Sequence, residues 1–312
     1  MAARILDGNA IRDSVLAELA SRVERAARYG VRPGLAAVLV GEDPASKIYV
    51  RNKIRACDRI GAHSETLRLP TETTTPELVA VVEELNGRDE IDGILVQLPL
   101  PGHVDAQRVL ACVSPEKDVD GFHPVNAGKL ASGQSCLAPC TPRGLIEILK
   151  RSQIQIKGRH AVVVGRSNIV GKPAALLLLA EHATVTICHS RTPDLPAVCR
   201  RAEILVAAAG RPAMLTREHI GDGAVVLDVG INRLEDAATV HRLFAHDPRR
   251  LERFDKAGSV LVGDVHPGDV IQRASAFTPV PGGVGPLTIA MLMSNTLAAA
   301  SRRTPADVPM RA

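Results

Sequence analysis

Short apolar runs that alternate with helical stretches constrain the fold of this chain more than any other feature. In the first half, the runs at residues 35–40 and 91–98 predict buried strands, with a helix expected between them over about 45–61. The second half repeats the pattern, with strands expected over 161–164, 183–188, 204–207 and 224–229. Strands that alternate with helices of this length form parallel sheets covered on both faces. We therefore expect an α/β protein.

A break separates the two alternating stretches. Residues 112–144 carry Pro, Gly, Ser and Cys with little periodicity, and 312 residues exceed the usual size of one domain. These features predict two domains, with the break between them in this stretch. A charged, weakly periodic stretch over about 234–259 is expected to be a surface insertion. A last helix is expected from Gly285 to about Ala300, followed by a frayed tail.

Composition and charge exclude several classes of protein. The 38 basic and 34 acidic residues leave a net charge of +4, without a long block of one sign, and aromatic residues make up only 2% of the chain. Neither a polyanionic partner nor a stacking surface for single-stranded nucleic acid is therefore expected. The six cysteines show no metal-site spacing, so we expect mostly buried, reduced thiols and no metal. No signal core or apolar run of about 20 residues is present, which favours a cytoplasmic protein without a membrane partner.

A glycine-rich turn at residues 165–171 lies between an expected strand and an expected helix. Doubly wound folds bind a dinucleotide pyrophosphate at this position. Ser167 replaces the second glycine of the usual pattern, so the turn alone is equally compatible with a tight turn that binds nothing. The next strand ends without the carboxylate that NAD sites normally place there. NADP is therefore favoured, because its 2′-phosphate can accept hydrogen bonds from Arg166, Ser190 and Arg191.

Tyr49 and Lys53 are four residues apart on the first expected helix after a strand, so they share one face. Periodicity alone favours a half-buried tyrosine beside a lysine that extends to solvent. Gln97 points to a ligand site instead, because it follows four apolar residues near the carboxyl end of a buried strand. A buried amide needs a specific partner.

Seven motifs together identify a family resemblance that covers nearly the whole chain in order. The chain resembles the bifunctional methylenetetrahydrofolate dehydrogenase/methenyltetrahydrofolate cyclohydrolase family. The motifs are residues 40–53, 93–101, 117–122, 139–142, 165–171, 228–232 and 278–286.

The resemblance implies a three-layer α/β domain for folate, formed by residues 1–138 and 286–312, and a Rossmann-type NADP-binding domain over residues 139–285. The C-terminal helix is expected to pack back on the first domain, with the substrate cleft between the two domains. The resemblance also implies a homodimer.

The implied chemistry has two steps. NADP oxidises 5,10-methylenetetrahydrofolate to 5,10-methenyltetrahydrofolate, and water then converts that product to 10-formyltetrahydrofolate at the same site. Two alternatives remain open: a dehydrogenase with little cyclohydrolase activity, and a non-catalytic paralogue that binds folate or NADP.

The resemblance also assigns roles to individual residues. Lys53 would be the base or proton relay of the hydrolytic step, which requires a partly neutral amine, and Gln97 would hydrogen-bond it. Tyr49 would stack on the folate and Asp120 would accept hydrogen bonds from the pterin. Further folate contacts would come from Val96, Leu98, Pro281, Gly282, Gly283 and Val284. The NADP site would be lined by Gly165, Arg166, Ser167, Ser190, Arg191 and Ile231.

Two features depart from the family pattern. His266 stands where the family usually has a short residue, and it is expected to be a loop or surface histidine more often than a ligand-facing group. The stretch from about Asp236 to Gly258 is longer than usual. It follows the strand end on the cofactor side, so it could alter coenzyme affinity or a subunit contact.

Overall fold

The computed structural model describes residues 3–245 and 247–303, and the tail expected to fray lies outside these residues. The chain divides into two compact units. Unit 1 comprises Met1–Ile11 and Thr141–Leu287, and unit 2 comprises Arg12–Cys140 and Thr288–Ala312. These units lie close to the expected domains, except that the first residues of the chain group with unit 1. Strand β1 (Arg4–Ile5) pairs with β11 (Ala276–Phe277) in the sheet of unit 1.

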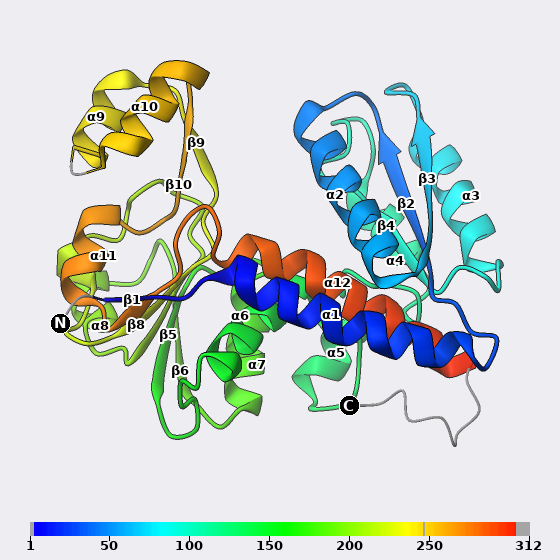
Figure 1. Cartoon of the computed structure of the whole chain (residues 1–312), viewed down its shortest axis with the longest axis horizontal. Helices are drawn as coiled ribbons and strands as arrows, with labels where there is room; N and C mark the ends of the chain where they lie inside the picture. The colour runs from blue at the N-terminus through cyan, green and yellow to red at the C-terminus, as the bar shows by residue number, and fades with distance from the viewer. Residues whose placement is uncertain (1–2, 246, 304–312) are drawn as a thin grey trace. The chain divides into compact units, whose positions relative to one another are not determined.

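Unit 2 is built on a parallel sheet of three strands with the order β3-β2-β4. The central strand β2 (Gly34–Val40) is buried along its whole length, as its apolar sequence predicts, and β4 (Gly93–Val96) is buried too. Helix α2 (Pro44–Ile60) covers one face, while α3 (Thr75–Asn86) and α4 (Ala106–Cys112) cover the other (Figure 1). The parallel sheet with helices on both faces is confirmed.

The edge strand β3 (His63–Leu69) does not follow from the apolar pattern, because most of its side chains are polar and only partly buried. It pairs with β2 along its whole length, from Gly34 opposite His63 to Val40 opposite Leu69. An edge strand has one neighbour and a more solvated surface, so it needs less apolar sequence than a central one.

The stretch expected to be irregular contains a helix of its own. Helix α5 (Pro124–Ala131) lies within residues 112–144, and α6 (Cys140–Arg151) begins at the end of that stretch. Pro124 at its first position and the His123 ring, which accepts a hydrogen bond from the backbone N–H of Val125, fix the start of α5. Eight residues are too few for a clear apolar period.

Two long helices complete unit 2. Helix α1 (Gly8–Ala27) follows β1, and α12 (Val284–Ala300) is followed by the short η2 (Ser301–Arg303). The Asn295 side chain donates to the carbonyls of Val119 (2.7 Å) and Ala138 (3.0 Å), and Arg303 pairs with the buried Asp92. The C-terminal helix therefore packs on the domain that carries β2, as expected.

Helix α12 with η2 is long and apolar enough to cross a membrane by length and composition, which the analysis of apolar runs did not anticipate. However, 61% of its apolar window is buried inside the protein, and it carries the buried polar residues Asn295 and Thr296. A core helix of a soluble protein passes the same test, so this feature is weak evidence for a membrane span.

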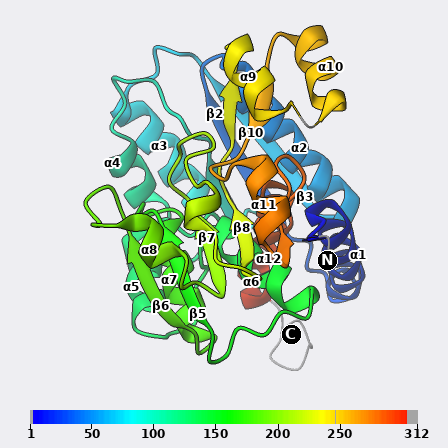
Figure 2. The same cartoon turned by 90° about the vertical axis from the view of Figure 1, so that its left-hand side faces the viewer.

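Unit 1 contains a parallel sheet of six strands with the order β1-β11-β8-β7-β5-β6. Figure 2 labels its strands β5, β6, β7 and β8. Strand β5 pairs with both β6 and β7, so the direction in which the sheet grows reverses at β5. Ligands bind outside the carboxyl ends of the strands at such a switch point. The strands and flanking helices are β5 (His160–Val164), α7 (Gly171–Ala180), β6 (Thr184–Cys188), α8 (Leu195–Cys199), β7 (Ile204–Ala207), η1 (Arg217–His219), β8 (Val225–Asp228) and α11 (Pro267–Arg273). The Rossmann-type fold is confirmed.

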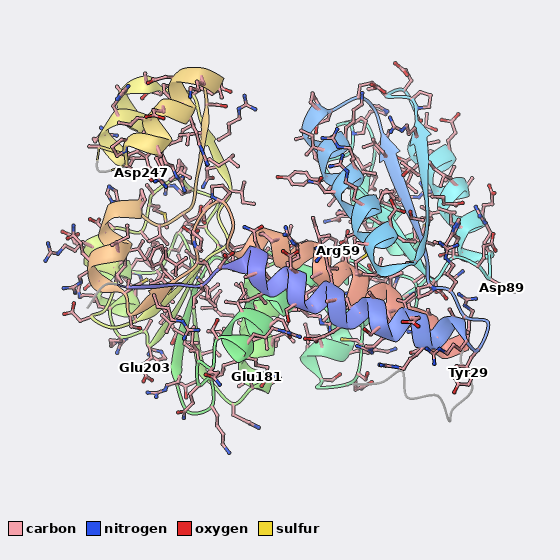
Figure 3. The ribbon with its side chains drawn as sticks, in the orientation of Figure 1. Tyr29, Arg59, Asp89, Glu181, Glu203 and Asp247 are labelled. Atoms are coloured by element: carbon pink, nitrogen blue, oxygen red, sulfur yellow. The ribbon has the colours of Figure 1, made fainter. Side chains whose placement is uncertain are left out.

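The charged stretch after β8 is more ordered than its weak periodicity indicates. An antiparallel hairpin of β9 (Asn232–Leu234) and β10 (Val260–Val262) carries helices α9 (Ala237–Leu243) and α10 (Pro248–Ala257) at its tip (Figure 1). We call residues 236–258 the insertion. Asp236 and Asp247, the latter labelled in Figure 3, cap the two helices. The insertion buries a small cluster of its own, which includes Val240, Leu243, Phe244 and Phe254.

Candidate active site

Lys53 and Gln97 form a direct hydrogen bond in unit 2. Lys53 projects from α2, and its Nζ donates to Oε1 of Gln97 at 3.0 Å. Gln97 follows β4 and is buried. Its Nε2 donates to the carbonyl of Leu98 at 2.5 Å, and its backbone N–H donates to the carbonyl of Val38 at 2.9 Å. Because the amide NH₂ is engaged by Leu98, the oxygen is the atom that faces Lys53. The two residues are 44 positions apart in sequence and meet as the family resemblance implies.

Tyr49 stands one helical turn before Lys53 on α2 and is 46% exposed. The helix is fixed at its start by Asp43, whose carboxylate accepts from the Ser46 N–H at 2.7 Å, and at its end by Gly61 with φ of 78°. The tyrosine ring is therefore presented by a well-capped helix on the same side as Lys53. An exposed ring on a rigid element is suited to stacking on a flat ligand.

Asp120 lies in a turn that is organised around its neighbour Asp118. The buried Asp118 carboxylate accepts from the backbone N–H groups of Gly121, Phe122 and His123 at 2.8–3.1 Å and from the Asn126 amide at 2.9 Å. Burial raises the pKa of Asp120, the charge of Lys53 opposes that rise, and the charge of Asp118 adds to it. Asp120 and Lys53 therefore belong to one electrostatic cluster, as the assigned roles require.

The glycine-rich turn of unit 1 leaves no room for side chains at two positions. Gly165 has φ of 131°, and a Cβ there would lie 2.0 Å from the Ala208 carbonyl oxygen after β7. A Cβ on Gly171 would lie 2.2 Å from the carbonyl oxygen of Gly165. The Ser167 hydroxyl accepts from the N–H groups of Val170 (3.1 Å) and Gly171 (3.3 Å). This tight cradle between β5 and α7 fits the close backbone approach that a pyrophosphate needs.

The residues expected to read the 2′-phosphate are all exposed: Arg166, Ser190 and Arg191. The Gly165 N–H donates to the Cys188 carbonyl at 2.9 Å, which joins the glycine turn to the end of β6. Residues 189–192 contain no carboxylate. Two arginines and a hydroxyl without a competing negative charge fit a phosphate at this edge of the sheet.

A cavity of about 430 Å³ lies next to the carboxyl end of β8 in unit 1. Ile231, 50% exposed, contributes to its wall together with the segment 279–286, which includes the expected folate loop Pro281–Val284. The loop is held by the first residue of α1, because the Gly8 N–H donates to the Gly282 carbonyl at 2.9 Å. A Cβ on Gly8 would lie only 1.7 Å from the Gly283 carbonyl oxygen, so this packing requires glycine.

Two buried carboxylates at this end of the sheet were missed by sequence reasoning. Asp264 is fully buried and accepts from the N–H groups of Ala209, Gly210 and Arg211 and from the Asn232 amide, at 2.7–2.9 Å. Asp228 accepts from the N–H groups of Gly230, Asp264 and Val265, each at 2.9 Å. Burial raises the pKa of Asp228 to about 7, and the Asp264 charge adds to the rise. The sequence signals were the family motif 228–232, which begins at Asp228, and a glycine directly before Asp264.

His266 caps a helix. Its Nδ1 accepts from the Asp269 N–H at 3.3 Å at the start of α11, which fits the expected loop position. The six cysteines are free, and four of them are buried, as predicted: Cys57, Cys140, Cys188 and Cys199.

A parallel sheet with a glycine cradle at its switch point defines this protein as a dinucleotide-binding α/β enzyme. The sequence profile described as "Tetrahydrofolate dehydrogenase/cyclohydrolase, NAD(P)-binding domain" matches residues 139–304, and the one described as "Tetrahydrofolate dehydrogenase/cyclohydrolase, catalytic domain" matches residues 6–120. The chain belongs to the tetrahydrofolate dehydrogenase/cyclohydrolase family.

Known proteins resemble this chain over nearly its whole length. "Bifunctional protein FolD" from Solibacter usitatus is 58% identical over 96% of this chain and 98% of its own. The crystal structure of a bifunctional FolD enzyme from Campylobacter jejuni has a TM-score of 0.87 at 41% identity and covers 97% of this chain and 100% of its own. The Trypanosoma brucei enzyme, solved with NADP cofactor and inhibitor, has a TM-score of 0.86 at 38% identity, with coverages of 97% and 99%. The expected family, fold class, paired activities and NADP cofactor are confirmed.

Proposed function

We propose that Tyr49, Lys53, Gln97 and Asp120 form the reaction site of this bifunctional methylenetetrahydrofolate dehydrogenase and methenyltetrahydrofolate cyclohydrolase. The observation that carries this proposal is the 3.0 Å hydrogen bond from Lys53 to a buried Gln97, within reach of the Asp120 charge. The four side chains come from three separate segments of unit 2.

Lys53 moves the proton in the hydrolytic step. Water must add to the methenyl carbon and lose a proton, and a positioned amine can accept that proton or relay it. Gln97 holds the Lys53 nitrogen in place and, as a neutral amide, does not lock it into an ion pair. This division of roles explains why Gln97 is itself fixed by two further hydrogen bonds, from its side chain to Leu98 and from its backbone to Val38.

Folate binding uses the remaining groups. The exposed Tyr49 ring stacks on the flat substrate, and the Asp120 carboxyl accepts hydrogen bonds from pterin N–H groups. Val96 and Leu98 flank Gln97 on the same strand end, and the loop Pro281–Val284 lets backbone approach the ligand closely because two of its residues are glycines.

The dehydrogenase step needs positioning more than acid or base catalysis. NADP accepts a hydride from the methylene carbon, and the folate nitrogens stabilise the cation that remains. Gly165, Ser167 and the start of α7 would cradle the pyrophosphate, Arg166, Ser190 and Arg191 would hold the 2′-phosphate, and Ile231 would contact the cofactor at the end of β8. The protein's main contribution is to hold both ligands in a reactive arrangement.

We further propose that unit 2 is the folate domain and unit 1 the NADP-binding domain, close to the expected divisions at residues 138 and 286. We also propose a cytoplasmic enzyme without nucleic-acid or membrane partners, supported by the near-balanced charge and scarce aromatics and by the burial of the apolar helix α12. The family resemblance supports a homodimer.

The experiment that tests the site is Lys53→Ala, with Lys47→Ala as the matched control on the same helix. Lys47 pairs with Glu42 at the surface. The Lys53 variant should lose hydrolysis of methenyltetrahydrofolate by about 10²-fold or more, because positioned proton transfer contributes that much. NADPH formation from methylenetetrahydrofolate should persist, so the methenyl product should accumulate. Unchanged hydrolysis, or an equal loss in the control, would contradict the role of Lys53.

A further inference from the structure

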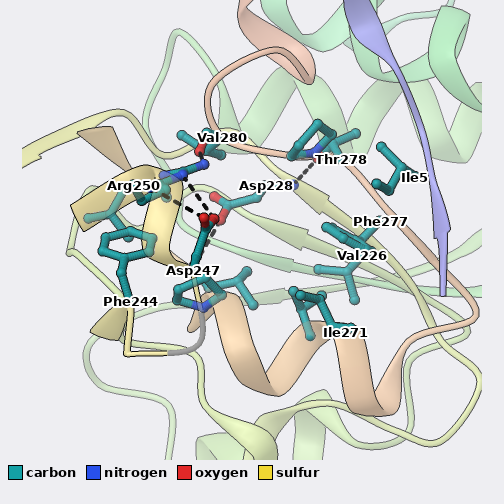
Figure 4. A pocket seen from close by; sticks show the side chains of 16 residues that line it. Ile5, Val226, Asp228, Phe244, Asp247, Arg250, Ile271, Phe277, Thr278 and Val280 are labelled. Carbon is teal, nitrogen blue, oxygen red and sulfur yellow. Dashed lines mark hydrogen bonds and ion pairs between the residues drawn. The ribbon is translucent and has the colours of Figure 1, made fainter. Parts of the chain in front are cut away.

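Arg250 ties the insertion to the core of unit 1 through two main-chain carbonyls. It lies on α10, and its side chain is 19% exposed. One guanidinium nitrogen donates to the Leu261 carbonyl on β10 at 2.7 Å, and the other terminal nitrogen donates to the Val280 carbonyl. Figure 4 shows the guanidinium reaching from the insertion to Val280, beside a smaller cavity of about 190 Å³.

The insertion holds this guanidinium in a fixed orientation. The Arg250 guanidinium carbon lies 4.8 Å from the centre of the Phe244 ring, which is a cation–π contact, and Nε lies 3.9 Å from an Asp247 carboxylate oxygen (Figure 4). Phe244 is almost fully buried in the cluster of the insertion. A planar guanidinium that is held on one side can fix the position of the carbonyl groups that it binds on the other side.

Both carbonyl partners belong to residues that line the 430 Å³ cavity next to β8. Leu261 contributes one part of the wall, and Val280 directly precedes the loop Pro281–Val284. Arg250 itself does not line that cavity, so it joins two parts of the wall, Leu261 and Val280, from outside the cavity. The loop has a second anchor in the Gly8 N–H, which binds Gly282. Arg250 therefore fixes the side of the loop that Gly8 does not hold.

We propose that Arg250 is a positioning residue through which the insertion sets the shape of the Pro281–Val284 loop, and with it the affinity for the folate substrate. The inference rests on the proposed contact between this loop and folate. It gives the insertion a role in substrate binding that acts through main-chain carbonyls, without direct contact between Arg250 and the ligand.

The test compares Arg250→Ala with Arg249→Ala, whose exposed side chain is the neighbour on the same helix. Loss of the charge-assisted hydrogen bonds to the Leu261 and Val280 carbonyls should raise KM for methylenetetrahydrofolate about tenfold. At saturating substrate kcat should stay within about twofold, because ground-state and transition-state binding weaken together. KM for NADP should change little. Arg250→Lys keeps the charge and loses the planar guanidinium with its two terminal donors. It should therefore raise KM for folate by a smaller factor than Arg250→Ala.

Thermal unfolding of each variant separates positioning from folding. An Arg250→Ala protein that is folded and shows the KM of the parent for folate would overturn the proposal. If that variant does not fold, Arg250→Lys decides: a raised KM for folate supports the proposal and an unchanged KM overturns it. Gly282→Ala strains the loop directly, because Gly282 has φ of 103°. This variant separates the folate contact of the loop from the effect of Arg250 on the loop. If it raises KM while the Arg250 variants do not, the loop contacts folate without help from Arg250. If neither changes KM, the proposed folate contact of the loop fails as well.

Discussion

The residues assigned to catalysis in unit 2 and those assigned to the coenzyme in unit 1 are held in opposite ways. Gln97 is buried and hydrogen-bonded through both side-chain ends and its backbone, and the turn of Asp120 is built around the buried Asp118. Arg166, in the glycine cradle, and Arg191, after β6, are instead exposed to solvent. Proton transfer demands a fixed geometry, whereas a phosphate can be held by long cations that reach it. The two sites should therefore respond differently to small chemical changes.

The largest effect should come from Gln97→Glu, which keeps the shape of the side chain and adds a charge. A carboxylate would form an ion pair with Lys53 and hold its amine protonated, so hydrolysis of methenyltetrahydrofolate should fall about 10²-fold. Dehydrogenase activity should fall much less. Separate assays of the two steps provide the check, with the exposed Gln134→Glu as control. Equal losses in both activities would mean that Gln97 serves only the fold.

A smaller effect should follow from Asp264→Asn, which tests how much the hydrogen bonds to the buried Asp264 carboxylate stabilise unit 1. The amide NH₂ would face backbone N–H groups that now donate to a carboxylate oxygen, leaving at least one donor unsatisfied. The free energy of unfolding should drop by about 2 kcal/mol. Chemical denaturation of the variant beside Asp222→Asn, whose carboxylate is 81% exposed, measures the difference. A loss no greater than that of the control would show that the Asp264 cluster is dispensable.

Next in size is Arg191→Ala, which probes the exposed coenzyme groups. If Arg191 binds the 2′-phosphate, KM for NADP should rise about tenfold and KM for NAD should barely change. Arg201→Ala removes another exposed arginine of the same unit and serves as control. Steady-state kinetics with both coenzymes give the answer. Equal effects on NADP and NAD would remove Arg191 from the phosphate site.

The smallest effect concerns the pH dependence of stability. Burial raises the pKa of Asp228 to about 7, above its unfolded value of 3.8. The folded state then binds the proton more tightly, so this stabilising contribution is present at low pH and is lost as pH rises toward and past 7. It should decline by about 1 kcal/mol between pH 6 and pH 7. Asp228→Asn should flatten that slope in urea unfolding. A slope identical to that of the parent protein would place the titration elsewhere.

Much of the fold could be predicted because most of its parallel strands are buried and therefore apolar along their length. The apolar runs of β2, β4, β5, β7 and β8 carry that signal directly. The edge strand β3 was missed since its polar side chains are partly solvated, and the short β1 was missed since two residues carry no period.

The site could be predicted only in part. Tyr49, Lys53, Gln97 and Asp120 each carried a local or motif signal, although their meeting depends on the fold. The contact of Arg250 with Val280 spans 30 positions, and that of Asp228 with Asp264 spans 36. Backbone groups are the partners in both cases. Since nearly all residues carry the same backbone carbonyl and N–H, the sequence does not indicate which of these groups a side chain will hydrogen-bond.

The way the chain passes between the two units has a consequence for its synthesis. Neither unit is a continuous segment: residues 1–11 belong with 141–287, and residues 12–140 belong with the end of the chain. The first passage lies within α1 and the last lies within α12. On the ribosome, residues 12–140 must therefore wait for the final helix, whose Asn295 closes hydrogen bonds to Val119 and Ala138, before their unit is complete. Protein that is truncated before α12 leaves unit 2 unfinished, so the nascent chain depends on that helix for a finished enzyme.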